Sequence, residues 1–188
     1  MSACVFAFQV VVALLALSAC VSPAKKLPEY GAVPDFDLTD SHGRPFDSKS
    51  LNGKVWIADF IYTNCPGPCP RMTSQMHSLV EKLQRERDVR FVSFTVDPAR
   101  DTPPVLNDYA QHFGPSGQWY FLTGAPDTLH HLARNVFMVG DLINVMDHST
   151  KFILVDGKRQ IRGFYSTFDK DGMSALIQDV ETLSRSRS

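Results

Sequence analysis

From Val33 onward, the sequence alternates short apolar runs with segments whose apolar residues recur every three or four positions. The short runs predict strands at residues 35–38, 54–62, 91–96, 119–122, 151–155 and 160–165. The periodic segments predict amphipathic helices directly after Cys69, over 102–114, over 126–136 and around Met173–Val180. Because the run over 54–62 is mostly apolar, we expect that strand to be covered on both faces.

This order of elements predicts one α/β domain, a three-layer sandwich of helices around a mixed sheet. A cysteine pair where the strand 54–62 meets the next helix, with a hairpin and a helix closing the chain, is the arrangement of the thioredoxin-like fold. The helix after the cysteines carries an apolar stripe of Met72, Met76, Leu79, Val80 and Leu83. We expect its methionines to pack in the core rather than to bind a metal.

The first nineteen residues differ from the rest of the chain. They contain no charged side chain, and Val10–Leu17 is almost entirely aliphatic. That run is short for a membrane span, which needs about twenty apolar residues, but it suits a secretory signal. It ends in Leu17-Ser18-Ala19-Cys20, which resembles the lipobox of bacterial lipoprotein signals. Because no Lys or Arg precedes Lys25, an ordinary cleaved signal and an uncleaved anchor remain alternatives.

These observations predict the organisation of the whole chain. We expect a lipoprotein-type signal peptide over residues 1–19, a lipidated Cys20 with a tether over 20–32, the domain over 33–184, and a tail over 185–188. The protein would then be exported and held at the membrane, on the periplasmic or extracytoplasmic side, by its N-terminal lipid. The formal net charge of −1 provides no basic field for binding nucleic acid.

Of the four cysteines, Cys65 and Cys69 are the pair that lies within the predicted domain. Pro66 and Pro68 disfavour a helix between them, whereas Pro70 fits the first turn of the helix that follows. Cys65 is therefore expected in a loop, and Cys69 at a helix N-terminus that favours its thiolate. Thiolates serve both disulfide exchange and binding of a soft metal, so the pair alone does not decide between a dithiol reagent and a metal site.

His148 favours the metal site. It precedes the predicted strand 151–155, which in a thioredoxin-like sheet lies beside the strand that leads to the cysteines. Two thiolates and one imidazole form a soft, three-donor set that suits Cu(I), and Asp147 is placed to orient the imidazole. Residues 146–149 contain no proline, whereas thioredoxin-like oxidoreductases usually have a cis-proline at this position.

Taken together, these motifs resemble those of the SCO/SenC family of copper-binding proteins over about residues 33–183. The resemblance is carried by Phe60-Ile61-Tyr62-Thr63 before Cys-x-x-x-Cys-Pro, Thr95-Val96-Asp97-Pro98 with Arg100-Asp101-Thr102-Pro103, Trp119–Gly124, and Asp147-His148-Ser149. It implies copper bound by Cys65, Cys69 and His148, as Cu(I) with Cu(II) left open. It also implies delivery to cytochrome c oxidase subunit II or another cuproprotein client, with reduction of that subunit's cysteines as a further role.

The cysteine pair is also compatible with functions other than copper binding. The main alternative is a thiol-disulfide oxidoreductase that uses Cys65 or Cys69, and the next is a peroxidase or redox sensor with Thr63 and Arg71 assisting. A copper carrier would have no turnover of its own, and closing Cys65 and Cys69 into a disulfide would release its metal. Asp97, Arg100 and Asp101 are expected to cap a helix and order a loop, and His42, His77, His112, His130 and His131 to lie at the surface.

Overall fold

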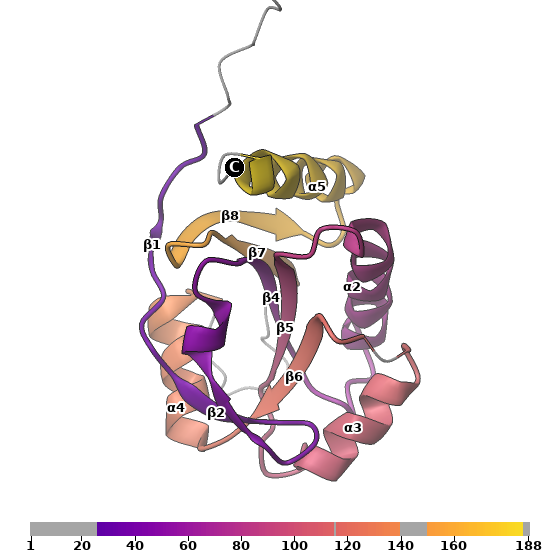
Figure 1. Cartoon of the computed structure of the whole chain (residues 1–188). Coiled ribbons are helices and arrows are strands. Elements are labelled where there is room, and N and C mark those ends of the chain that lie inside the picture. The colour runs from indigo at the N-terminus through magenta and orange to yellow at the C-terminus, as the bar shows by residue number, and fades with distance from the viewer. Residues whose placement is uncertain (1–25, 115, 140–149, 186–188) are drawn as a thin grey trace, which may run out of the picture.

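The computed structural model describes residues 26–114, 116–139 and 150–185. They form an eight-stranded sheet in the order β1-β8-β7-β4-β5-β6-β2-β3 (Figure 1). In chain order the elements are β1 (Gly31–Ala32), β2 (Asp37–Asp40), β3 (Pro45–Asp47), the 3-10 turn η2 (Ser48–Leu51), β4 (Val55–Ile61), α2 (Cys69–Leu83), β5 (Val89–Thr95), α3 (Pro103–Gln111), β6 (Trp119–Thr123), α4 (Pro126–His131), the π turn η3 (Leu132–Val136), β7 (Lys151–Val155), β8 (Gln160–Ser166) and α5 (Lys170–Arg185).

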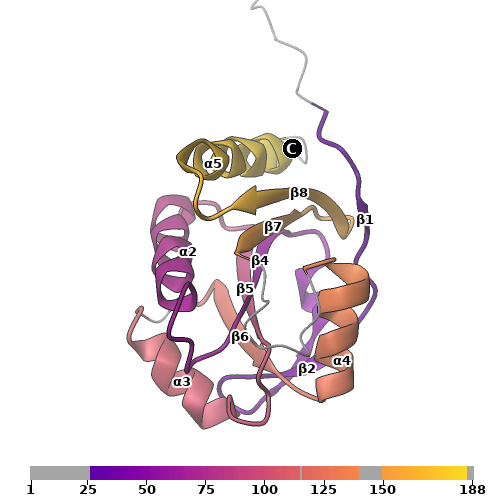
Figure 2. The ribbon, with the colours of Figure 1, turned by 180° about the vertical axis from the view of Figure 1, so that it is seen from behind.

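The sheet separates two layers of helices. Strands β4, β5 and β6 are parallel and are joined through α2 and α3, whereas β7 is antiparallel to both of its neighbours, β4 and β8. Helices α2, α3 and α5 lie on one face of the sheet and α4 on the other (Figures 1 and 2). The predicted three-layer, thioredoxin-like sandwich around a mixed sheet is confirmed. Among the described residues, no helix combines the length and the apolar character needed to cross a membrane.

The core forms on both faces of the central strand. All seven residues of β4 are buried, as its apolar sequence predicts, and the apolar stripe of α2 is buried against the α2 side of the sheet. On the α4 side, the rings of Phe60 and Phe94 stack at 5.0 Å, and Phe137 contacts both edge-on or tilted at 5.5 and 5.6 Å. These packed rings fix β4 and β5, whose ends carry the site.

Some short elements were not predicted from the sequence. Strand β3 pairs with β2 around the turn at residues 41–44, and β2 itself begins at Asp37 rather than 35. The last residues of the predicted tether also belong to the fold, because Leu27 is buried and β1 pairs with β8. Strands of two or three residues are too short to show an apolar periodicity, so only tertiary pairing reveals them.

Candidate metal centre

The two cysteines lie on the loop that leaves β4 and on the helix that follows it. The backbone N–H of Cys65 donates to the carbonyl of Tyr62 at 3.3 Å, which closes a tight turn directly after the strand. Cys69 is the first residue of α2, and Met72 N donates to the carbonyl of Pro68 at 2.9 Å in the first helical turn. Both cysteines are buried, reduced thiols in this structure.

The surroundings of the two thiols shift their pKa values in opposite directions. Burial opposes ionisation of Cys65, but its sulfur accepts hydrogen bonds from the Cys69 and Gly67 backbone, from the Cys69 thiol and from the Tyr62 hydroxyl, and these lower its pKa below the usual value. Burial raises the pKa of Cys69, and the nearby charges of Cys65 and Asp59 raise it further. The sequence predicted that the helix N-terminus would favour the thiolate of Cys69, but burial and these neighbouring charges raise its pKa instead.

A buried carboxylate, Asp101, is hydrogen-bonded to the loop that carries Cys65. Asp101 is 1% exposed and accepts hydrogen bonds from Thr63 N at 3.1 Å, from Thr63 Oγ1 at 2.6 Å and from Thr95 Oγ1 at 2.5 Å. Thr63 lies two residues before Cys65, and Thr95 ends β5. Asp101 thus joins the cysteine loop to the loop before α3, so it orders a loop and does not cap the helix.

A second buried carboxylate lies in the middle of β4. Asp59 is completely buried, and its Oδ1 accepts from Ser93 Oγ at 2.6 Å, which in turn accepts from Trp119 Nε1 at 3.0 Å. Its Oδ2 has no hydrogen-bond partner among the described residues. Burial raises the pKa of Asp59 to about 7. This residue was not predicted from the sequence, although a single acid within an apolar strand was the available signal.

The remaining predicted site residues, Asp147 and His148, lie outside the described residues, as does Cys20. The described chain resumes at Thr150, directly before β7. Because Ala58 pairs with Ile153 in antiparallel register, the start of β7 lies at the same edge of the sheet as the end of β4. No group of three or more His, Cys, Asp or Glu side chains suited to a metal occurs within the described residues alone.

The other candidate residues lie in the core, at the surface or in contacts that hold the fold together. Met72 and Met76 are fully buried in the core, as predicted, and none of the five remaining histidines is buried. Arg71 donates to the carbonyl of Thr167 at 3.3 Å and its guanidinium lies 4.5 Å from the centre of the Phe168 ring. Since Thr63 binds Asp101, both residues that a peroxidase would require are engaged elsewhere.

Comparison with known proteins identifies relatives over nearly the whole described chain. The SCO1/SenC family model matches residues 25–185. The SCO1 protein homolog of Bacillus subtilis (strain 168) is 34% identical over 179 residues, or 90% of this chain and 92% of that protein. BsSco, a member of the Sco family of cytochrome c oxidase assembly proteins in which a disulfide switch was identified, superposes with a TM-score of 0.75 at 33% identity, covering 86% of this chain and 97% of that one. Yeast Sco1 with copper bound gives a TM-score of 0.67 at 29% identity, covering 82% and 90%.

Proposed function

The chain belongs to the SCO1/SenC family, whose members are copper-binding proteins involved in cytochrome c oxidase assembly, and we propose that it carries copper on Cys65, Cys69 and His148. The observation that carries this proposal is the pair of thiols hydrogen-bonded to each other at the edge of the sheet where β7 begins. Two sulfur donors already lie together there, and the chain places His148 two residues before Thr150.

The donor set suits copper as cargo. Two thiolates and a neutral imidazole give Cu(I) soft ligands. Because the pKa of Cys65 is lowered, less free energy is needed to deprotonate this first thiol when the ion binds. Binding of the cation then offsets the cost of ionising the buried Cys69. Asp147 is the residue we assign to orienting the imidazole. The copper-bound structure of yeast Sco1, which has the same fold, supports copper as the ion that is carried.

The client that we propose is cytochrome c oxidase subunit II, which would receive the ion through thiolate exchange. The same cysteines can reduce a disulfide of the client: Cys65 and Cys69 become a disulfide while the client's disulfide becomes two thiols. A closed disulfide has no thiolates for copper, so the redox state of the pair would control loading. The disulfide switch described for BsSco supports this part of the proposal.

We further propose that the protein acts at the outer side of a membrane, held there by a lipid on Cys20. The apolar stretch before Cys20 and the polar residues after it support this placement. A client with an exposed copper centre on that side is then within reach of the tethered domain.

A thiol-disulfide oxidoreductase remains the second candidate, because the unequal thiols favour it. A buried cysteine with a raised pKa next to one with a lowered pKa is an arrangement suited to nucleophilic attack by Cys65. The two functions differ in their need for His148, which thiol exchange does not require.

The test of the proposed function is copper transfer. Cu(I)-loaded protein is mixed anaerobically with the copper-free, reduced soluble domain of subunit II, and the ion on each partner is quantified after separation. We expect the client to become loaded, and the His148→Ala variant to have no copper to transfer while still reducing a model disulfide. Copper that stays on the unmodified protein would contradict the proposal.

A further inference from the structure

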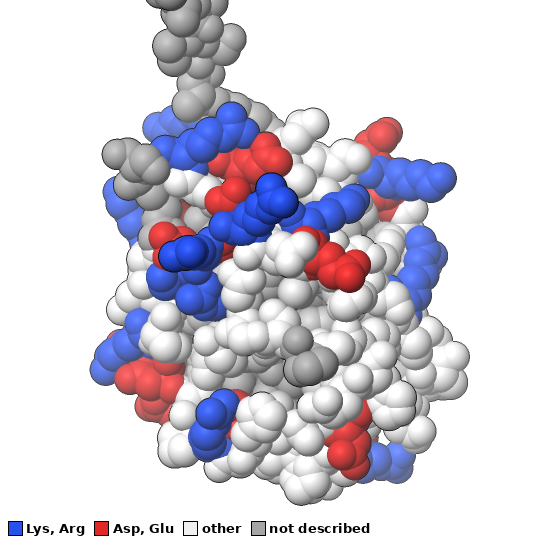
Figure 3. Space-filling view, turned by 45° about the vertical axis from the view of Figure 1, so that its right-hand side comes forward, with Lys and Arg blue, Asp and Glu red and all other residues white. Residues whose placement is uncertain are grey.

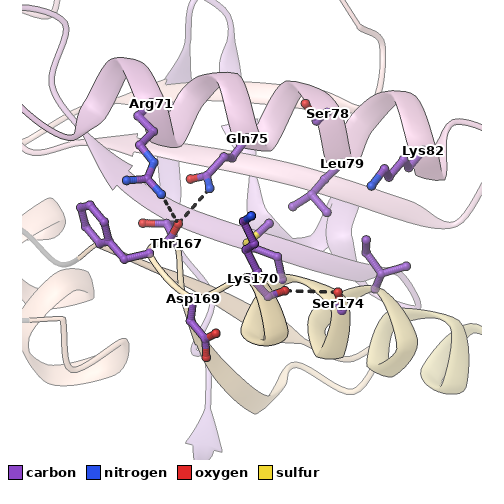
Figure 4. A pocket seen from close by; sticks show the side chains of 12 residues that line it. Arg71, Gln75, Ser78, Leu79, Lys82, Thr167, Asp169, Lys170 and Ser174 are labelled. Atoms are coloured by element: carbon purple, nitrogen blue, oxygen red, sulfur yellow. Dashed lines mark hydrogen bonds between the residues drawn. The ribbon is translucent and has the colours of Figure 1, made fainter.

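A groove runs between α2 and α5, starting near the end of α2 that carries Cys69. It encloses about 400 Å³ (Figure 4). We call it the α2–α5 groove, and its main lining residues are Gln75, Leu79 and Lys82 of α2 and Lys170, Met173 and Ile177 of α5. On α2 the lining extends from Arg71 to Lys82, a stretch of twelve residues that spans about 16 Å along the helix. The groove is therefore long enough to hold a peptide segment.

The inside of the groove is apolar. Leu79 is buried at its base, and Met173 and Ile177 of α5 are only half-buried beside it. At the rim, Phe168 is 57% exposed, one of the few large apolar side chains in the described chain that faces solvent. Arg71 covers one face of this ring at 4.5 Å. Partly exposed apolar side chains grouped in a groove are typical of a surface that a partner covers.

The rim of the groove is positively charged. Arg71, Lys82 and Lys170 are exposed there, and the one acid in the lining is Asp169, whose carboxylate accepts from Asp171 N at 2.9 Å in the first turn of α5. Figure 3 shows Lys and Arg side chains along the upper part of this face, interspersed with acidic ones, above a broad uncharged region. The carboxylates of α2 and α5 that pair with bases, Glu81 and Glu181, bind His77 and Arg185 rather than the lysines of the groove.

One end of the groove is joined to the candidate metal centre. Thr167 O accepts from Arg71 at 3.3 Å and from Gln75 Nε2 at 2.8 Å, as the dashed lines in Figure 4 show. The N–H and hydroxyl of Thr167 donate to the carbonyl of Thr150, directly before β7, at 3.0 and 2.8 Å. Arg71 is itself two residues after Cys69. A chain bound in the groove would therefore leave it beside the thiols.

We propose that the α2–α5 groove is the docking surface for an acidic, amphipathic segment of the copper client. This inference rests on the proposed function and adds to it a place and a chemistry for client recognition. Apolar side chains of the segment would cover Leu79, Met173 and Ile177, while its carboxylates would lie near Lys82 and Lys170. Such charges at a rim accelerate association and orient the partner more than they tighten the final complex.

The test compares charge reversal in the groove with charge reversal elsewhere. The Lys82→Glu/Lys170→Glu double variant of the full chain is loaded with Cu(I) and mixed with the copper-free soluble domain of subunit II in stopped flow. The matched control is Lys49→Glu/Lys158→Glu, which reverses two exposed lysines at the opposite edge of the sheet. We expect the groove variant to transfer copper about tenfold more slowly at low salt, with a weaker salt dependence, and the control to match the unmodified protein.

A second variant separates docking from folding. Ser78→Trp fills the groove from an exposed position of α2, so it should slow transfer while Cu(I) affinity and the unfolding midpoint stay unchanged. Equal transfer rates in all variants would overturn the inference and leave the proposed function intact. A Lys82→Glu/Lys170→Glu variant that transfers copper at the unmodified rate but no longer binds anionic lipid vesicles would overturn it as well, since the occupant of the groove would then be a membrane. No transfer even from the unmodified protein would overturn the proposed function and this inference together.

Discussion

Replacing Asp101 by Asn tests whether hydrogen bonds to this buried carboxylate stabilise the conformation of the cysteine loop. The carboxylate is 1% exposed and accepts three hydrogen bonds from Thr63 and Thr95 at 2.5 to 3.1 Å. A hydrogen bond to a charged group contributes about 1.5–3 kcal/mol, and a neutral one about 1 kcal/mol. The amide offers one acceptor oxygen in place of two, so one bond is lost and the others weaken. Because Asn is also less costly to bury than a carboxylate, we expect a net loss of about 2 kcal/mol of stability.

Urea unfolding of the reduced protein measures this loss, and chelator competition measures the Cu(I) affinity. Since Thr63 lies two residues before Cys65, Asp101→Asn should also weaken copper binding by roughly tenfold. The matched control is Asp179→Asn, which removes another buried carboxylate, one that accepts from Tyr165 at 2.8 Å between β8 and α5. The control should lose stability and keep its copper affinity. An Asp101→Asn variant with the stability and affinity of the unmodified protein would refute this role for Asp101.

Three further predictions follow from the core and the thiols. Because burial raises the pKa of Asp59 to about 7, the folded state holds a proton that the unfolded state releases above about pH 4, so stability should fall as the pH rises towards 7. Asp59→Asn should remove this slope and add up to about 4 kcal/mol at pH 8, as urea unfolding across pH would show. Alkylation of the native protein at pH 8, mapped by mass spectrometry, should modify Cys65 well before Cys69. Phe94→Ala, which breaks the ring cluster with Phe60 and Phe137, should cost about 3–5 kcal/mol in chemical unfolding.

Most of the long elements could be predicted from the sequence because each has a clear periodicity. The apolar run of β4 and the stripe of α2 from Met72 to Leu83 appear in the structure as expected. The prolines around the cysteines placed Cys65 in the loop and Cys69 at the start of α2 for local steric reasons. Apolar periodicity and the steric effect of proline both act between residues that are close in the sequence, so they can be recognised without the tertiary structure.

The properties that depend on tertiary contacts could not be predicted in the same way. The link from Asp101 to Thr63 joins residues 38 positions apart, and no local pattern indicates it. The raised pKa of Cys69 was not predicted, because the helix N-terminus is a local feature, whereas the burial of Cys69 and its proximity to Asp59 come from packing of the whole domain. The α2–α5 groove likewise exists only once two distant helices lie side by side.

The most direct test of copper binding by Cys65, Cys69 and His148 is an anaerobic Cu(I) titration of the reduced protein alongside Cys65→Ser, Cys69→Ser and His148→Ala. We expect tight binding of one ion per chain by the unmodified protein and a large loss of affinity in each variant, because each removes one of three donors. Weak binding that does not depend on His148, together with rapid reduction of a model disulfide, would contradict the copper-carrier function and favour an oxidoreductase.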